Sequence, residues 1–341
     1  GVIDSITYNK YTYENITIDG EYKRGGFDGS IMLDDPNGYF ALLGSFNVAE
    51  KTPSFNFNAT FNGIRPQALH LTDKEKESEW SMEVNANFTG GAIDQMNGEI
   101  NIENLRLVTA DEIHKMKHFN VSAIHTEEYN QLIIDSEFLK GKIEGKYSYK
   151  TLSQSIQKLL YSYLPALSTF NPDKKQSISN QFTFNLDLYN TDILNDFFDI
   201  PLQVYTHSSL EGQWDDETGK YVMRGYFPKA QYNNTRIESG VFLFNNYADE
   251  LQSTLRFNHQ RRNSAVTLSL NLEAKDNQIH SKFNWGNSGE HTYSGSIKGT
   301  TTFNKEKEES LKTTLEIEKT QVILNDSTLV VHPSTIQFND N

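Results

Sequence analysis

The sequence has no cysteine among its 341 residues, only eight prolines, and no run of about 18 apolar residues. Without cysteine there is no disulfide and no thiolate for metal binding or catalysis, and this absence is compatible with an oxidising envelope compartment. The scarcity of proline argues against a proline-rich linker or a disordered chain. The lack of a long apolar run excludes a predicted membrane-spanning helix.

Basic residues are also scarce. The sequence has 31 Lys and Arg against 45 Asp and Glu, which gives a formal net charge of −14. The negative charge is spread along the chain rather than collected in a tail. Nucleic-acid binding relies on clustered Lys and Arg that neutralise phosphates, so nucleic acid is not an expected partner.

Apolar and polar residues alternate along several stretches of the chain. In residues 265–273, Val266, Leu268, Leu270 and Leu272 fall on one face of an extended strand, and polar side chains fall on the other. Successive side chains of a strand point to opposite faces, so the pattern predicts a sheet with one apolar face. The predicted lining of that face is Phe55, Phe57, Phe61, Phe182, Phe184, Leu186, Leu188, Val266, Leu268, Leu270, Leu272, Phe283 and Trp285.

Turn residues divide the chain into about twenty predicted strands. For example, residues 34–38, Asp-Asp-Pro-Asn-Gly, predict the turn of a β-hairpin. A polar connector at 168–180 separates two sheet segments, 1–167 and 181–341, which we expect to continue one sheet. Hydrophobic residues make up 36% of the chain, which is low for a two-layer sandwich and natural for a single sheet with one apolar face. We therefore predict an all-β fold.

The strongest predicted helix covers residues 151–164 and ends before Pro165. Thr151 and Gln154 form a capping-box pattern at its start. Because so short a helix is marginal alone, we expect it to dock on the apolar face as a cap, with a role as a plug or gate as the alternative. Its apolar stripe consists of Leu152, Ile156, Leu159, Leu160 and Tyr163.

Two further short helices are predicted, one at 109–117 from a capping-box pattern and one at 192–198. In the first, His114 and His118 would lie one turn apart with Glu112 nearby, a spacing that can hold a metal ion. No further ligand is identifiable and the HExxH pattern is absent. Surface histidines are therefore the favoured interpretation, and no metal site is predicted.

The sequence also lacks the patterns of a catalytic site. Acidic pairs such as Asp34-Asp35 and Asp215-Asp216 resemble glycosidase carboxylates, but they fall in predicted turns. No Gly-rich phosphate loop, Walker pattern or nucleophile elbow is present. We expect no enzymatic activity and no cofactor.

A central run and several shorter segments carry a family resemblance. The run is Ile134-Asp135-Ser136-Glu137-Phe138-Leu139-Lys140-Gly141, followed by Gly145-Lys146-Tyr147-Ser148-Tyr149, the helix, and Tyr163-Leu164-Pro165. The shorter segments are residues 13–20, 33–38, 190–194, 198–202, 284–287 and 323–327. In their order and number these segments resemble the translocation and assembly module family TamB, in its Bacteroidota-type branch of the AsmA-like group.

The resemblance implies a β-taco, a long sheet curled into a groove with an apolar interior and a polar outside. Members of that family are anchored in the inner membrane by an N-terminal helix and cross the periplasm. Their proposed roles are phospholipid transport to the outer membrane and assistance to outer-membrane protein assembly. The chain would then be an internal, periplasmic portion that meets membranes only through other parts of the protein. Its expected partner is phospholipid, through the acyl chains.

Two other functions remain open at this point. The first is a scaffold that pairs its strand edges with outer-membrane strands, with a barrel assembly protein as partner. The second is a periplasmic carbohydrate-binding β-sandwich, in which the Phe and Leu stripes would form an ordinary core. Clustered tryptophans would favour the sandwich, but Trp80, Trp214 and Trp285 are widely scattered.

Overall fold

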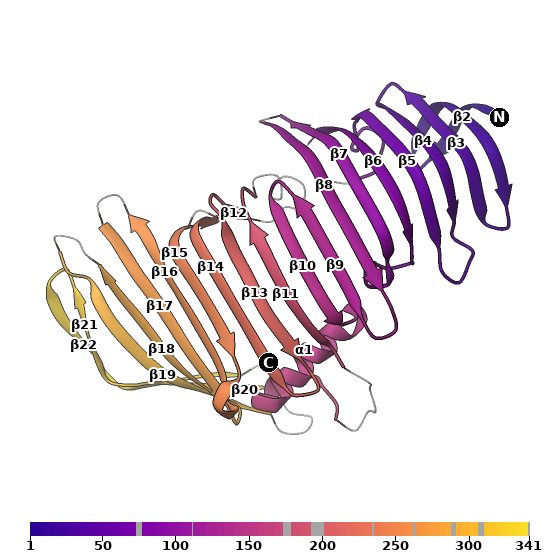
Figure 1. Ribbon diagram of the computed structural model, residues 1–341. Helices are drawn as coiled ribbons and strands as arrows, with labels where there is room; N and C mark the ends of the chain where they lie inside the picture. Colours follow the sequence, from indigo (N-terminus) through magenta and orange to yellow (C-terminus); the bar gives the residue numbers. More distant parts are fainter. Residues whose placement is uncertain are drawn as a thin grey trace. The chain divides into compact units, whose positions relative to one another are not determined.

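The computed structural model describes residues 1–72, 77–110, 112–172, 179–191, 201–233, 235–261, 264–287, 291–305 and 310–339 (Figure 1). Strands make up 69% of the described residues and helices 8%, which confirms the predicted all-β class. Contacts divide the chain into two units, residues 1–142 and 143–341, and the division falls inside strand β10 (Leu139–Lys146). The connector predicted at 168–180 lies within the second unit. Each unit is a curled, unclosed antiparallel sheet.

The first unit is a meander in which each strand pairs with the next one along the chain. The hairpin predicted at residues 34–38 joins its third and fourth strands, as expected. A short 3₁₀ turn, η1 (Ile93–Gln95), precedes the seventh strand. The strands are β1 (Val2–Tyr8), β2 (Tyr11–Lys23), β3 (Gly26–Asp35), β4 (Gly38–Asn47), β5 (Ser54–Ile64), β6 (Ser78–Thr89), β7 (Asn97–Thr109), β8 (Ile113–His125) and β9 (Asn130–Ser136).

The predicted helix at 109–117 is wrong, because this segment forms the β7–β8 turn and the start of β8. The Thr109 hydroxyl does accept a hydrogen bond from the backbone N–H of Glu112, at 3.2 Å, but it does so across a tight turn. His114 and His118 consequently lie on a strand, where four residues span about 13 Å. Across the described ranges no group of three His, Asp or Glu side chains is arranged to hold a metal ion.

In the second unit, neighbouring strands from β13 to β19 pair in sequence, and β11 pairs with β13. Strand β12 also pairs with β14, β20 pairs with β19 and β23, and β21 pairs with β19 and β22. The strands are β11 (Gln181–Leu188), β12 (Leu202–Val204), β13 (Ser208–Asp215), β14 (Lys220–Tyr232), β15 (Thr235–Asn245), β16 (Leu251–Arg261), β17 (Ser264–Lys275), β18 (Gln278–Asn287), β19 (Ser294–Asn304), β20 (Lys312–Ile317), β21 (Thr320–Leu324), β22 (Ser327–Val331) and β23 (Ser334–Asn339).

The helix predicted at 151–164 is present as α1 (Tyr149–Tyr163). Its N-cap is Ser148, and Thr151 contacts Ser148 O rather than forming the predicted capping box with Gln154. Pro165 opens the 3₁₀ turn η2 (Pro165–Leu167), and a third such turn, η3 (Tyr247–Asp249), precedes β16. The helix predicted at 192–198 lies outside the described residues. In the ranges described, no helix is long and apolar enough to cross a membrane.

Candidate functional site

The apolar face of the second unit is a set of rows that run across the strands. In an antiparallel pair, directly opposed residues share a face, so the strand register traces each row. One of them is the Leu270 row, and none of its members carries a charge. In strand order the row is Leu186, Leu210, Gly225, Phe242, Leu255, Leu270, Phe283 and Ile297.

The other predicted lining residues of this unit lie on the same face. Phe184 and Leu272 belong to a second row, on either side of Gly212, Met223 and Phe244. Leu268 and Trp285 are opposite each other in a third row. Phe182, Leu188 and Val266 occupy the same alternate positions of their strands. The structure therefore brings the predicted lining of β11, β17 and β18 onto one surface.

Glycines lie beneath aromatic rings on this surface. A Cβ added at Gly212 would meet Cζ of Phe184 at 2.6 Å, and one added at Gly225 would meet Cε2 of Phe227 at 2.8 Å. The missing side chain at Gly212 leaves room for the Phe184 ring over the neighbouring strand, and that at Gly225 leaves room for the Phe227 ring of the same strand. The rows consequently form a smooth apolar floor.

This floor is not covered as a sandwich core would be. None of the predicted lining residues is fully buried, and all are half-buried except Phe283, which is 39% exposed. Leu255, near the middle of the Leu270 row, is 40% exposed. In a β-sandwich the inner faces of two sheets interdigitate and bury such residues. Among the described residues of this unit, no second sheet packs on the rows.

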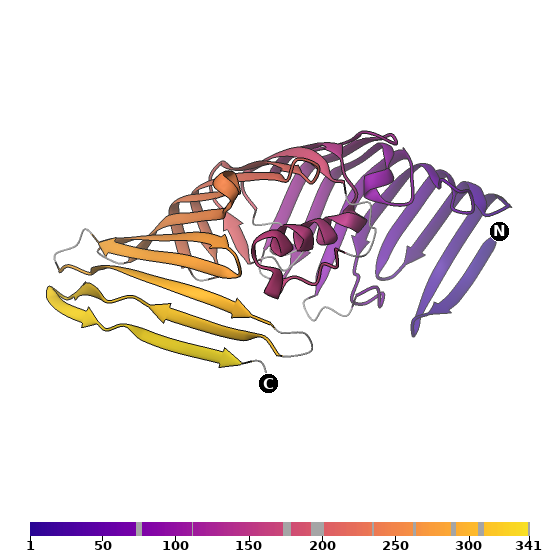
Figure 2. The same cartoon turned by 90° about the horizontal axis from the view of Figure 1, so that it is seen from below.

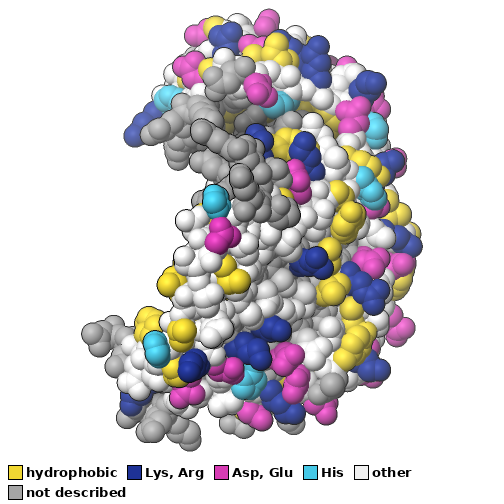
Figure 3. All heavy atoms as spheres, turned by 90° about the vertical axis from the view of Figure 1, so that its left-hand side faces the viewer, with side chains coloured by type: hydrophobic (Ala, Val, Ile, Leu, Met, Phe, Trp, Pro, Cys, Tyr) yellow, Lys and Arg dark blue, Asp and Glu magenta, His cyan; other side chains and the backbone are white. Residues whose placement is uncertain are grey.

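Charged side chains lie on the opposite face. The alternate register row includes Glu211, Arg224, Lys282 and Lys298, and none of these side chains enters the apolar rows. Seen from the end of the second unit, Lys and Arg are mixed with Asp and Glu, and with some hydrophobic side chains, along the convex side (Figure 3). The two faces of the sheet are therefore chemically distinct, as the alternation predicts.

The first unit has the same two-faced construction. Its apolar rows contain Phe55, Phe57 and Phe61, and the rings of Phe55 and Phe88 stack with centroids 4.6 Å apart. One row continues across eight strands and carries no charge. In strand order it is Ile18, Ile31, Leu42, Ala59, Val84, Ile102, Phe119 and Ser136.

The polar face of the first unit carries a ladder of asparagines on four neighbouring strands. Asn58, Asn85, Asn101 and Asn120 are opposed in register. The amide of Asn85 donates to Asn58, and that of Asn120 donates to Asn101. Such a ladder pairs the side-chain amides with one another on the solvent-facing side and keeps the apolar residues on the other face.

Helix α1 packs on the apolar face of the second unit, on its concave side (Figure 2). Leu159 is 4% exposed and contacts Trp214 and Tyr221. Of the rest of the predicted stripe, Leu152, Leu160 and Tyr163 are half-buried. Ile156 is 48% exposed, so the sheet covers only part of the stripe.

A buried carboxylate fastens the helix to the sheet. Asp216 is 4% exposed and accepts hydrogen bonds from the hydroxyls of Ser155 and Tyr221. It also accepts from Trp214 Nε1 at 3.1 Å and from the backbone N–H of Asn180 at 2.9 Å. Charge-assisted hydrogen bonds of this kind are stronger than neutral ones. Sequence reasoning placed Asp216 in a solvated turn and did not identify Ser155 as its partner.

Tyr221 makes the contact between α1 and the sheet sensitive to high pH. Burial and the neighbouring Asp216 carboxylate raise the pKa of Tyr221 above its ordinary value of 10.0. The folded state therefore keeps a proton that the unfolded chain loses, so the stabilisation is present below pH 10 and is lost as the pH rises above it. We expect the free energy of unfolding to fall above about pH 10. Urea titrations should show a smaller fall in Tyr221→Phe, and identical pH profiles would contradict this assignment.

No protein-family profile, curated protein or solved structure matches the sequence. The half-exposed apolar rows are therefore the feature from which a function is inferred.

Proposed function

We propose that the chain carries phospholipid acyl chains along the apolar face of its sheet. It would act as a non-catalytic, periplasmic bridge segment of a TamB-like protein between the inner and outer membranes. The observation that carries the proposal is the Leu270 row of the second unit, which crosses eight strands without a charge and whose side chains are all partly exposed. Soluble proteins rarely leave extended apolar surface open unless it contacts a ligand, a partner or a membrane.

The energetics of burial suit a hydrocarbon chain. Each buried methylene contributes about 0.8 kcal/mol, so a sixteen-carbon chain gains at most ~12 kcal/mol. Because the rows repeat the same chemistry at every strand, about 4.8 Å apart, neighbouring positions along the face are similar in energy. Such a surface favours sliding over tight binding in one pocket.

The floor is better suited to hydrocarbon than to polypeptide. Strands β13 to β18 are paired on both sides, so their backbone N–H and C=O groups are already used in the sheet. An added peptide strand needs free backbone partners, whereas an acyl chain needs none. This distinction supports lipid as the occupant of the rows.

Lipid occupancy is the direct test. The chain would be purified from cells under mild conditions, and native mass spectrometry with solvent extraction would count the bound phospholipid. We expect at least one copy per chain. A clean apo mass, together with no binding of added phosphatidylethanolamine, would refute the proposal.

A strand-pairing scaffold remains the second candidate because of β1. Within the described residues β1 pairs only with β2, and every residue of it is exposed, including Val2, Ile3, Ile6 and Tyr8. An open edge of this kind can accept a further strand. Photocrosslinks from β1 to outer-membrane barrel proteins, without lipid in the rows, would favour this function.

A further inference from the structure

We infer that α1 is a fixed side wall of the acyl-chain path in the second unit, and that Ile156 and Leu160 contact the lipid. This inference rests on the proposed lipid function and goes beyond it. It replaces both a cap over the Leu270 row and a mobile gate with a wall beside that row. It also adds two ligand-contacting residues that lie outside the sheet.

The helix lies along one margin of the sheet. Its start is held at β11, where Ser148 N donates to Asn180 Oδ1 at 3.0 Å. Its end is held at the β17–β18 turn, where the backbone N–H of Asn277 donates to Tyr163 O at 3.0 Å. Fifteen helical residues span about 22 Å. The five strand spacings from β11 to β17 cover about 24 Å, so helix and margin match in length.

The two sides of the helix face different surroundings. Leu159 faces the sheet, and Lys158, one residue earlier, reaches the marginal β13–β14 turn, where its Nζ donates to Asp216 O at 3.0 Å. Leu160 follows Leu159 by one residue, about 100° further round the helix. It therefore points away from the margin, toward the middle of the strands, and Ile156 lies one turn earlier on the same side.

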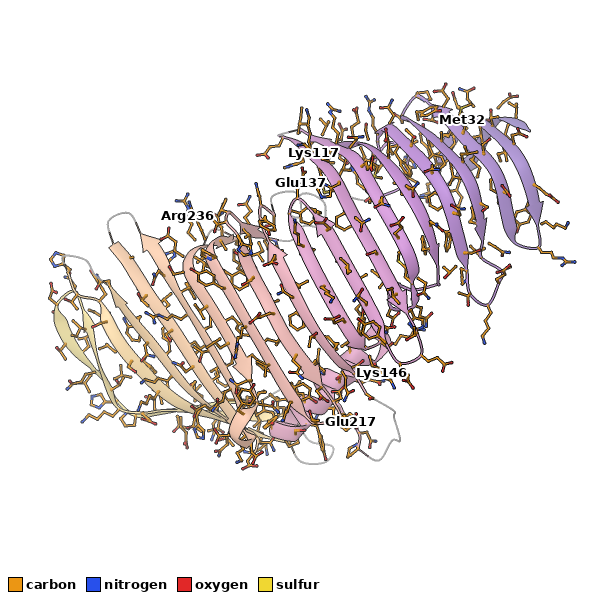
Figure 4. The ribbon with its side chains drawn as sticks, in the orientation of Figure 1. Met32, Lys117, Glu137, Lys146, Glu217 and Arg236 are labelled. Carbon is orange, nitrogen blue, oxygen red and sulfur yellow. The ribbon has the colours of Figure 1, made fainter. Side chains whose placement is uncertain are left out.

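Figure 4 shows both ends of the strands, the margin beside α1 and the opposite end. Glu217 lies in the β13–β14 turn beside α1, and Arg236 lies at the other end of the sheet. Between them run the apolar rows, including Leu270 and its neighbours. By this geometry the side of α1 that bears Ile156 faces these rows. Ile156 is 48% exposed although it belongs to the apolar stripe.

The hydrogen bonds that join α1 to the sheet are those expected of a static element. The helix is joined to three separate turns of the sheet, through Asp216, through Asn246 Nδ2 to the Tyr163 hydroxyl at 2.9 Å, and through Asn277. Asp216 in addition holds Ser155 in the buried part of the contact. Opening a gate would break all of these contacts together, whereas a wall keeps them.

A pair of helix variants tests the wall. Ile156→Asp places a charge on the side that faces the rows, and Tyr161→Asp places the same charge at a side chain that is 38% exposed elsewhere on the helix. We expect Ile156→Asp to lower occupancy by phosphatidylethanolamine about tenfold and Tyr161→Asp to leave it unchanged. Normal occupancy in Ile156→Asp would overturn the inference.

Photocrosslinking of the unmodified chain makes the test independent of variant folding. The probe is phosphatidylethanolamine with a diazirine in one acyl chain, and the adducts are mapped by peptide mass spectrometry. Adducts at Ile156 or Leu160 together with β17 support the wall. Adducts on β17 and β18 but none on α1 would reject the wall and leave the lipid function intact. Absence of any adduct would count against the lipid function itself.

Discussion

Leu270→Asp should reduce phospholipid occupancy at least about tenfold and block passage along the second unit. Leu270 lies in the Leu270 row between Leu255 and Phe283, and all three side chains are partly exposed. An acyl chain laid across this position would have to desolvate the new carboxylate, which costs several kcal/mol without a partner. Because every path along the row passes this strand, one charge should interrupt movement across it.

The cost to folding should be small by comparison. Leu270 is only half-buried, so its replacement should lower the free energy of unfolding by about 1–2 kcal/mol. The matched control is Ser269→Asp, which adds the same charge one residue earlier on the opposite face, opposite Arg256 and Asn284. We expect this control to bind lipid as the unmodified chain does.

The measurement is phospholipid per chain by native mass spectrometry, with transfer of labelled phosphatidylethanolamine between vesicles as the second readout. Urea unfolding of each variant checks that the fold persists. Equal occupancy in Leu270→Asp and Ser269→Asp would contradict the lipid assignment. Loss of phospholipid occupancy in both variants, with normal unfolding, would show that the ligand does not distinguish the apolar face from the polar face.

The two-faced sheet could be predicted because its cause is local. Side-chain direction alternates with a period of two, so the residues at 266, 268, 270 and 272 had to share one face once the segment was a strand. The absence of charge at these positions could also be read from the sequence. Whether a second layer of structure covers the apolar face could not be predicted, because the exposure of these side chains depends on where the rest of the chain packs.

The predictions that failed did so where local signals are ambiguous. A hydroxyl followed three residues later by an acidic residue can satisfy backbone groups in a helix start or in a tight turn. At Thr109 the pairing of β7 with β8 favours the tight turn over a helix start. Ile156 belongs to the predicted stripe and is 48% exposed, because periodicity defines a stripe but not the width of the surface that receives it. The packing of α1 on the sheet brings Ser155 to Asp216, 61 residues away, and no local pattern predicts that contact.

Asp216→Ala should be the most destabilising substitution in the contact between α1 and the sheet. The carboxylate is buried, and its removal leaves the Tyr221 hydroxyl and the Asn180 N–H without this acceptor. Buried donors without a partner cost roughly 1–3 kcal/mol each, so we expect a loss of about 3–4 kcal/mol. Amide hydrogen exchange should rise first in α1, because Ser155 loses its partner as well.

Glu217→Ala is the control for that substitution, since Glu217 is exposed and lies next to Asp216 in the same turn. It should change the free energy of unfolding by no more than about 0.5 kcal/mol. Urea denaturation of both variants, combined with hydrogen exchange resolved to α1, separates a local effect from a global one. Equal stability of the two variants would mean that apolar packing of Leu159 holds the helix without the carboxylate. A large loss confined to Asp216→Ala, with protection of α1 lost and the strands still protected, is the result that a fastened wall requires.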